Sequence, residues 1–176
     1  MKKTGCEYVN YGIESLDSKL LQDMRKNLTL DQIHKGVQAA LNAGISPGLN
    51  FIWGFPGDTV DNLWKAVEFL KKYDPCDELR TIRPVTPYPG CELYKLAIEK
   101  GLLEGPEDFY ENKHKNSDLV TVNLTDIPTD EMHRQLWFAN QALYKNFLEK
   151  RKRETWEITK SLYVDGDTSF RGFRMV

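Results

Sequence analysis

The chain has 176 residues, 40% of them hydrophobic, which is enough for one domain with a packed core and a smaller addition. Its 24 Lys and Arg residues nearly balance 26 Asp and Glu residues, so the net charge of −2 argues against a broad basic surface for nucleic acid. No segment approaches the roughly 20 apolar residues of a membrane-spanning helix. Three widely spaced cysteines suit a reduced compartment rather than a disulfide framework. We therefore expect a soluble, cytoplasmic protein that binds no nucleic acid and does not span a membrane.

The first part of the chain is typical of a strand followed by helices. Residues 7–13 are rich in β-branched and aromatic side chains, and a helical face begins at Leu16. A second helix should begin after Thr29, because Thr29 and Gln32 have the spacing of a capping box. Gly44 is suited to end that helix in the left-handed conformation.

Two further strand and helix units follow. The second strand is expected at residues 48–53, and the helix after it should be capped by Asp58 or Thr59. The third strand is expected at residues 79–85, and a shorter helix after it should end at Gly101. Three such units in series predict an α/β fold with a parallel sheet and right-handed crossovers.

The pattern changes in the C-terminal part of the chain. A short extended piece is expected at residues 119–122 within an otherwise irregular segment. A long amphipathic helix should begin near Thr129 and end near Arg153, and no strong pattern follows it. We therefore divide the chain into residues 1–125, which hold the three βα units, and residues 126–176, which hold the helix and tail.

Two segments are typical of a ligand site at the end of a parallel sheet. Gly54-Phe55-Pro56-Gly57 leads from an apolar strand directly to a helix, and its glycines let the backbone approach a ligand. Gly12-Ile13-Glu14-Ser15 repeats this order of strand, glycine and polar residue before a helix. We expect both strand ends to offer polar groups to one crevice.

Together with Pro84-Val85-Thr86-Pro87-Tyr88-Pro89-Gly90, these segments resemble the second half of the partial (βα)6 TIM barrel of radical S-adenosylmethionine (SAM) enzymes. The resemblance covers residues 6–101. Residues 47–59 and 80–90 are most similar to the subgroup that carries a cobalamin-binding domain upstream. The resemblance implies a three-unit βα fragment of that barrel with a C-terminal helical extension, taken from an iron–sulfur, oxidoreductase-like enzyme.

The resemblance also implies which residues bind SAM. Glu14 matches an acidic residue close to the ribose and amino acid of SAM, and Lys26 matches a basic residue that pairs with its carboxylate. Asn50 matches a polar residue beneath SAM, and Val85 matches the position where the backbone lies against adenine. The implied cofactor-binding set is Glu14, Ser15, Lys26, Asn50, Gly54, Pro56 and Val85. It includes neither a catalytic residue nor a metal ligand.

Simpler interpretations exist for these residues. Glu14 would also suit the positive end of a helix dipole, and Lys26 would also suit a solvated surface. Gly54 requires a turn whether or not a ligand binds.

The cysteines depart from the family pattern. A [4Fe–4S] cluster in the family is held by Cys-x-x-x-Cys-x-x-Cys, whereas Cys6, Cys76 and Cys91 are far apart in the sequence. We interpret the chain as a C-terminal fragment that is inactive by itself. Its parent would bind SAM, the cluster and, in the subgroup, cobalamin. The expected partners are the missing N-terminal half of the barrel and an unknown substrate.

A second class of function is a non-catalytic assembly module, or one that binds an anion at the helix N-terminus after Gly54. In either class, the open edge of the first strand and an apolar inner sheet face should require a cover. We expect a homodimer, which symmetry favours, or a monomer in which the helix at 129–153 or the tail at 154–176 folds over the gap.

Overall fold

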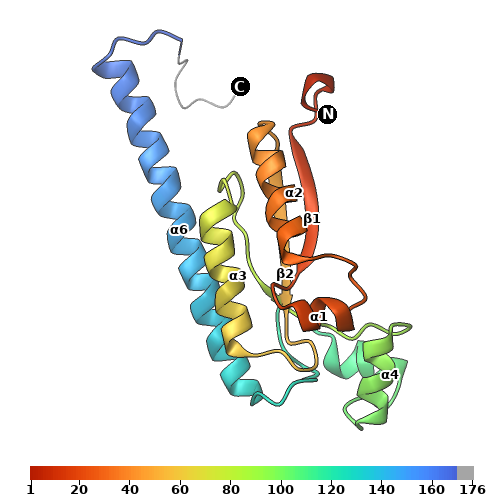
Figure 1. The fold of residues 1–176 in the computed structure, drawn as a ribbon. Helices are drawn as coiled ribbons and strands as arrows, with labels where there is room; N and C mark the ends of the chain where they lie inside the picture. The colour runs from red at the N-terminus through yellow and green to blue at the C-terminus, as the bar shows by residue number, and fades with distance from the viewer. Residues whose placement is uncertain (170–176) are drawn as a thin grey trace.

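A computed structural model describes residues 1–169 of the chain (Figure 1). In chain order its elements are η1 (Lys2–Thr4), β1 (Tyr8–Glu14), α1 (Ser18–Asp23), α2 (Leu30–Asn42), β2 (Ser46–Trp53), α3 (Val60–Tyr73), β3 (Arg83–Pro84), α4 (Glu92–Glu99), α5 (Pro106–Asp108), the π-helical turn η2 (Phe109–Lys113) and α6 (Thr129–Tyr163). The three strands pair in parallel in the order β1-β2-β3. The predicted α/β fold, a three-strand parallel sheet with a C-terminal helix, is confirmed.

Local signals in the sequence set the bounds of α2. The Thr29 side chain accepts a hydrogen bond from the Gln32 amide, and Gln32 Oε1 accepts one from the Thr29 amide at 2.9 Å, which completes the predicted capping box. After the last turn, Gly44 adopts a φ of +67°, as expected for a left-handed stop.

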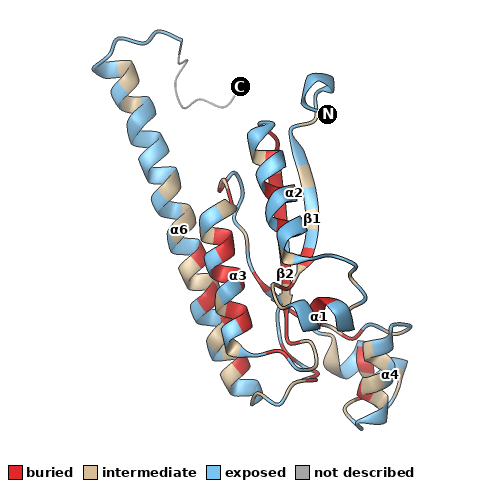
Figure 2. Ribbon diagram, viewed as in Figure 1, coloured by how far each residue is buried: buried red, intermediate tan, exposed pale blue. Residues whose placement is uncertain are grey.

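The helix α3 begins at the second of the two expected caps. Thr59 is its N-cap, because the Thr59 hydroxyl accepts a hydrogen bond from the Asn62 amide. Both α2 and α3 turn their buried faces toward the strands (Figure 2). The core there is formed by alternate residues of β2 and by apolar residues of the two helices: Leu49, Phe51, Trp53, Ile33, Val37, Leu63, Val67 and Leu70.

The helix α6 packs against α3 and is longer than predicted. Four predicted apolar positions are buried: Met132, Leu136, Ala139 and Leu143. The helix continues to Tyr163 rather than ending near Arg153, and its C-terminal part extends away from the sheet, largely exposed (Figures 1 and 2). Helix elongation adds one backbone hydrogen bond per residue, so residues with good propensity prolong it without an apolar face. An Arg151–Glu154 ion pair adds to this exposed part.

The third strand is shorter than the predicted 79–85. At Ile82 the backbone groups that could pair with a neighbouring strand instead form hydrogen bonds with a side chain of α6. The Ile82 amide donates to Asn140 Oδ1 at 2.8 Å, and Asn140 Nδ2 donates to the Ile82 carbonyl oxygen at 3.0 Å. Only Arg83–Pro84 pairs with β2. The extended piece predicted at 119–122 is not a strand. Val120 is buried there, and its amide donates to His133 of α6.

The sheet face that points away from the helices is polar, so the expectation of an apolar inner face was wrong. In the parallel register, Asn10 lies opposite Gly48, and Gly12 lies opposite Asn50. Asn10, Gly12 and Asn50 are exposed, and Tyr8 at the start of β1 is 41% exposed. Neither α6 nor the described part of the tail covers this polar face, and residues 170–176 lie outside the described residues. Among residues 1–169, no helix is both long and apolar enough to cross a membrane.

Candidate functional site

Glu14 and Lys26 form an ion pair at the carboxyl end of β1. Lys26 Nζ lies 3.0 Å from Glu14 Oε1 and donates a second hydrogen bond to the Gly12 carbonyl oxygen at 2.8 Å. Glu14 has a φ of +68°, next to an irregularity in the register between Gly12 and Glu14. A Cβ at Gly12 would lie 2.6 Å from Glu14 Oε1, so the glycine makes room for the pair. A left-handed non-glycine residue is costly, and such residues gather at functional sites.

Asn50 belongs to the same surface as this ion pair. It lies in register with Gly12 on the exposed sheet face, and its Nδ2 donates to Asn10 Oδ1 at 3.1 Å. The structure therefore places Asn50 of β2 beside Gly12, whose carbonyl oxygen accepts from Lys26, on the same exposed face as the ion pair. That these residues bind SAM stays a prediction.

The loop after β2 is closed by a buried carboxylate. Gly54 has a φ of +104° and donates its amide to Asp58 Oδ2 at 3.0 Å. Asp58 Oδ1 accepts from the Thr59 amide and from Asn62 Nδ2. Burial raises the pKa of Asp58 above its ordinary value, and the hydrogen bond from the Gly54 amide opposes this rise. Asp58 thus holds the turn, a role that the sequence analysis did not assign.

The remaining predicted residues take different positions. The Val85 amide donates to the Trp53 carbonyl oxygen at 2.9 Å, which places Val85 beside the end of β2, where it is buried. Ser15 is also buried, and its hydroxyl accepts from the Asp17 amide, so it holds its own turn. Pro56 lines a separate cavity of about 540 Å³ between its loop, the end of α1 and the start of α4. Ser15 is therefore engaged away from the ion pair.

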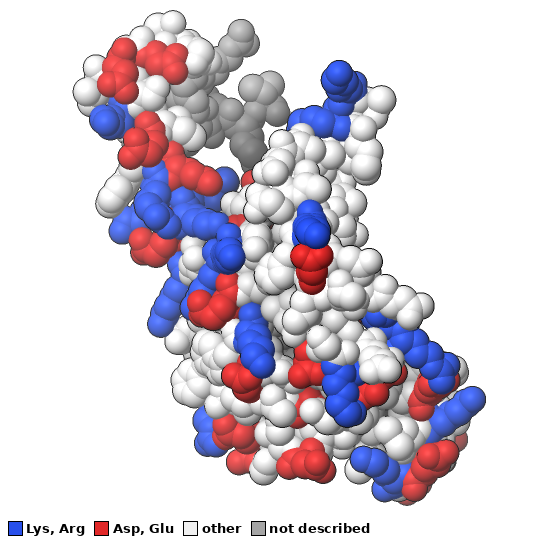
Figure 3. Space-filling view, in the orientation of Figure 1, with Lys and Arg blue, Asp and Glu red and all other residues white. Residues whose placement is uncertain are grey.

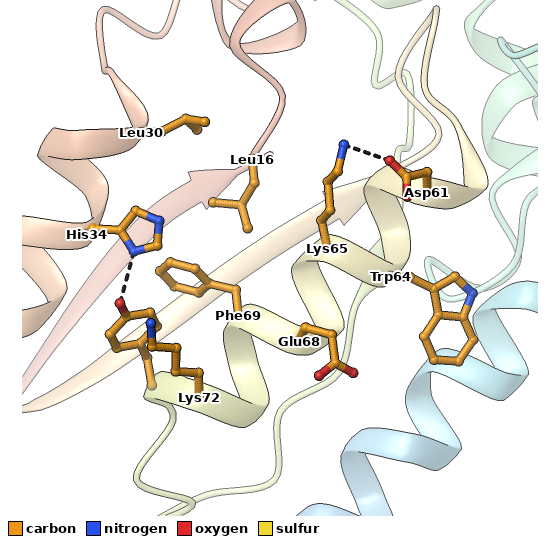
Figure 4. A pocket seen from close by; sticks show the side chains of 10 residues that line it. Leu16, Leu30, His34, Asp61, Trp64, Lys65, Glu68, Phe69 and Lys72 are labelled. Carbon is orange, nitrogen blue, oxygen red and sulfur yellow. Dashed lines mark hydrogen bonds and ion pairs between the residues drawn. The ribbon is translucent and has the colours of Figure 1, made fainter.

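A second cavity, of about 610 Å³, lies between α2 and α3 (Figure 4). Its lining is mainly apolar, with Leu16, Leu30 and Phe69, and His34 Nδ1 lies 3.0 Å from the Tyr73 hydroxyl oxygen. These helices cover the buried face of the sheet, so this groove is distinct from the Glu14 surface. Figure 3 shows charges of both signs interspersed over this side of the molecule.

The comparison with protein families concerns the N-terminal part of the chain. Residues 1–70, which include β1, Glu14, Lys26 and Asn50, match the model described as the Radical SAM superfamily. This part of the chain is similar to the radical SAM superfamily. This agrees with the resemblance in its sequence and with its parallel βα units.

Several curated relatives of this chain are named as methyl-transferring enzymes. An uncharacterized methyltransferase of Pyrococcus horikoshii is 37% identical over 103 residues, 58% of this chain and 22% of the relative. The hopanoid C-3 methylase of Methylococcus capsulatus is 27% identical over 173 residues, 96% of this chain and 31% of the relative. The bacteriochlorophyllide d C-8(2)-methyltransferase of Chlorobaculum tepidum is 29% identical over 101 residues, 56% of this chain and 22% of the relative. The chain spans less than a third of the length of each.

The polar surface fits one end of SAM. The amino acid part of SAM carries an ammonium and a carboxylate, and Glu14 and Lys26 offer the opposite charges side by side. Gly12 and Gly48 leave space for neighbouring polar side chains on the adjoining sheet face, because a Cβ at either position would collide with their polar atoms. An iron–sulfur cluster has no such fit. Within residues 1–169, no group of three or more His, Cys, Asp or Glu side chains is placed to hold a metal ion.

Proposed function

We propose that this chain supplies part of the SAM-binding crevice of a radical SAM methyltransferase. The observation that carries the proposal is the Glu14–Lys26 ion pair, held by a left-handed backbone at a strand end and next to Asn50 on one exposed face. The names of the relatives support methyl transfer as the reaction class. SAM, when bound, would supply the methyl group.

The residues of the crevice act by binding and orientation. The Glu14 carboxylate accepts hydrogen bonds from the ammonium or the ribose hydroxyls of SAM, and the Lys26 ammonium attracts its carboxylate. In the free chain Glu14 and Lys26 neutralise one another. When SAM binds, the Glu14–Lys26 pair would be replaced by a pair between Glu14 and the ammonium of SAM and a pair between Lys26 and its carboxylate. The crevice therefore recognises a neutral pair of charges rather than an anion.

The organisation of the whole enzyme is also a proposal. We place the [4Fe–4S] cluster on a part of the barrel other than residues 1–169 and a cobalamin on a separate upstream domain, in agreement with the sequence resemblance. The exposed polar face of β1 and β2 would then be completed by those parts. A cytoplasmic location agrees with the chemistry of an oxygen-sensitive cluster.

A non-catalytic anion-binding module fits the structure less well. The alternative places an anion at the N-terminus of α3, where the Asp58 carboxylate already accepts the amides of Gly54 and Thr59. Asp61 in the first turn adds another negative charge. An external anion would meet both carboxylates, so the Glu14 surface is the better candidate for a ligand.

Isothermal titration calorimetry with SAM tests the proposal on the 176-residue chain. Glu14→Gln and Lys26→Met each remove one charged partner and should weaken binding about tenfold or more, the usual effect of losing a charge-assisted hydrogen bond. Lys35→Met is the matched control, because Lys35 forms an exposed ion pair with Asp31 on α2. Equal affinity in all variants, or no binding by the wild type at millimolar SAM, would contradict the proposal.

A further inference from the structure

We propose that Tyr8, Asn10 and Arg80 are positioning residues that fix which end of the Asn50 side-chain amide faces the ligand. The inference rests on the proposed place of Asn50 in the SAM crevice. It concerns residues at the N-terminal end of the exposed sheet face, away from the Glu14–Lys26 pair.

A series of hydrogen bonds links β1, β2 and the segment that leads into β3. Arg80 Nη1 donates to the Tyr8 hydroxyl oxygen at 3.0 Å, and the Tyr8 hydroxyl donates to Asn10 Oδ1 at 3.1 Å. Asn50 Nδ2 donates to the same Asn10 oxygen at 3.1 Å. Tyr8 and Asn10 belong to β1, Asn50 to β2, and Arg80 to the segment that leads into β3.

The direction of these hydrogen bonds can be followed from the Arg80 guanidinium to Tyr8, Asn10 and Asn50 in turn. A guanidinium has donors and no acceptor, so the Tyr8 oxygen must accept from Arg80. In the structure the Tyr8 hydroxyl donates its single proton to Asn10, which presents its oxygen. Because that oxygen also faces Asn50, Asn50 must present its NH2 group. The Asn50 Oδ1 is thereby turned away from Asn10 as an acceptor, and within residues 1–169 it has no hydrogen-bond partner.

The Arg80 end of this series of hydrogen bonds is enclosed and close to two carboxylates, while Nε and Nη2 of Arg80 are buried without a hydrogen-bond partner in the described part of the chain. The Arg80 side chain is 11% exposed, and its guanidinium lies 5.4 Å from the centre of the Tyr8 ring. Its Nε lies 3.9 Å from Asp74 Oδ1, and its Nη1 lies 3.3 Å from Glu78 Oε2. A guanidinium offers only donors, so Arg80 cannot reverse its role in this hydrogen bond.

Gly48 has no side chain, and this leaves the space in which the Tyr8 side chain reaches Arg80. It lies in the middle strand in register with Asn10, and a Cβ at this position would collide with Tyr8 Oη and Asn10 Oδ1. Tyr8 of β1 thus contacts Arg80, in the segment before β3, across a residue of β2 that has no side chain. The result is a crevice with two acceptors, Asn50 Oδ1 and the Glu14 carboxylate, which suits a ligand rich in hydrogen-bond donors.

Side-chain amide NMR of the free chain tests the relay without any ligand. Tyr8→Phe removes only the hydroxyl, which frees Asn10 to reverse its amide, and the Asn50 NH2 resonances should shift or double. Tyr11→Phe is the matched control, since Tyr11 lies in the same strand on the opposite face and donates to the Gly36 carbonyl oxygen. Asn50 resonances that stay unchanged in Tyr8→Phe, or that change equally in Tyr11→Phe, would overturn the proposal.

SAM binding provides the second arm. Tyr8→Phe should lower the affinity about twofold to tenfold, the effect of one exposed hydrogen bond. The double variant Tyr8→Phe, Asn50→Asp should regain most of this loss, because both carboxylate oxygens accept and no orientation is needed. Absence of this recovery would contradict the relay. If the wild type fails to bind SAM, the proposed function is wrong. The Asn50 amide resonances of the free chain would still test whether Tyr8 and Asn10 orient Asn50.

Discussion

Lys26 Nζ lies 3.0 Å from Glu14 Oε1, so the two charged residues predicted to contact SAM contact one another in the free chain. Their side chains are 33% and 21% exposed, and partly exposed ion pairs contribute little to stability. We expect Lys26→Met to change the free energy of unfolding by no more than about 1 kcal/mol. Urea denaturation followed by circular dichroism measures this. A loss of several kcal/mol would assign the pair a structural role and weaken the binding interpretation.

The left-handed backbone of Glu14 predicts an unusual order of stability. Glu14→Gly and Glu14→Ala both remove the carboxylate, but only glycine adopts a φ of +68° without strain. Glu14→Gly should be more stable than Glu14→Ala by about 1 kcal/mol. Both variants should lose SAM affinity equally. If Glu14→Ala proves the more stable of the two in urea, the strained conformation is not present in solution.

Gly54 should not tolerate a side chain. Its φ is +104°, and a Cβ would lie 2.8 Å from Met132 Cε, so Gly54→Ala should destabilise the chain by about 1–3 kcal/mol. Gly36→Ala is the control, because Gly36 lies within α2 with no atom within 4 Å of its added Cβ. That variant should stabilise the chain by up to about 1 kcal/mol. The midpoint temperatures of thermal unfolding of the two variants should shift in opposite directions from that of the wild type. A shift of both in the same direction would contradict this prediction.

The sequence predicts elements well where the signals are local. Thr29, Gln32 and Gly44 set the bounds of α2 from within 16 residues, and the structure agrees. The length of β3 depends instead on Asn140, which is 58 residues from Ile82 in the sequence and takes its backbone groups. Neither propensity nor periodicity reveals such a distant contact.

Only part of the site could be predicted, because the contacts between its residues also join distant parts of the sequence. The resemblance selected Glu14, Lys26 and Asn50 individually, and the structure brings them to one face. Their pairing depends on the irregular end of β1, which the sequence does not show. The roles of Tyr8 and Asn10 had a usable signal, because strand alternation places both on the face of Gly12 and Asn50.

Asn140 should hold β3 to the rest of the fold. Asn140→Ala removes both hydrogen bonds to the Ile82 backbone and leaves a buried amide and carbonyl without these partners. We expect a loss of about 1–3 kcal/mol and faster hydrogen exchange at the Ile82 amide. Gln141→Ala on the same helix is the control. Comparable exchange at Ile82 in both variants would show that Asn140 does not carry this connection.

Asp58 should make the stability of the chain depend on pH. Burial raises the pKa of Asp58 above its ordinary value of 3.8, so the folded chain holds this proton more tightly than the unfolded chain. Its contribution to the free energy of unfolding is therefore complete below pH 3.8 and is lost as the pH rises through the raised pKa. The stability difference between wild type and Asp58→Asn should be smaller at about pH 7 than at about pH 4.

The control for this prediction is Asp61→Asn, which removes an exposed carboxylate two residues after Thr59. Urea titrations at both pH values give the required differences. A difference for Asp58→Asn that grows as the pH rises would mean that hydrogen bonds from Gly54 and Asn62 outweigh burial.

The central claim is that the exposed face at the end of β1 and β2 binds SAM. Titration of the isotopically labelled 176-residue chain with SAM, followed by backbone amide NMR, tests it most directly. The account predicts the largest shift changes at Gly12, Glu14 and Asn50, and smaller ones in the groove at His34 and Phe69. Shift changes confined to that groove, or none at millimolar SAM, would contradict it.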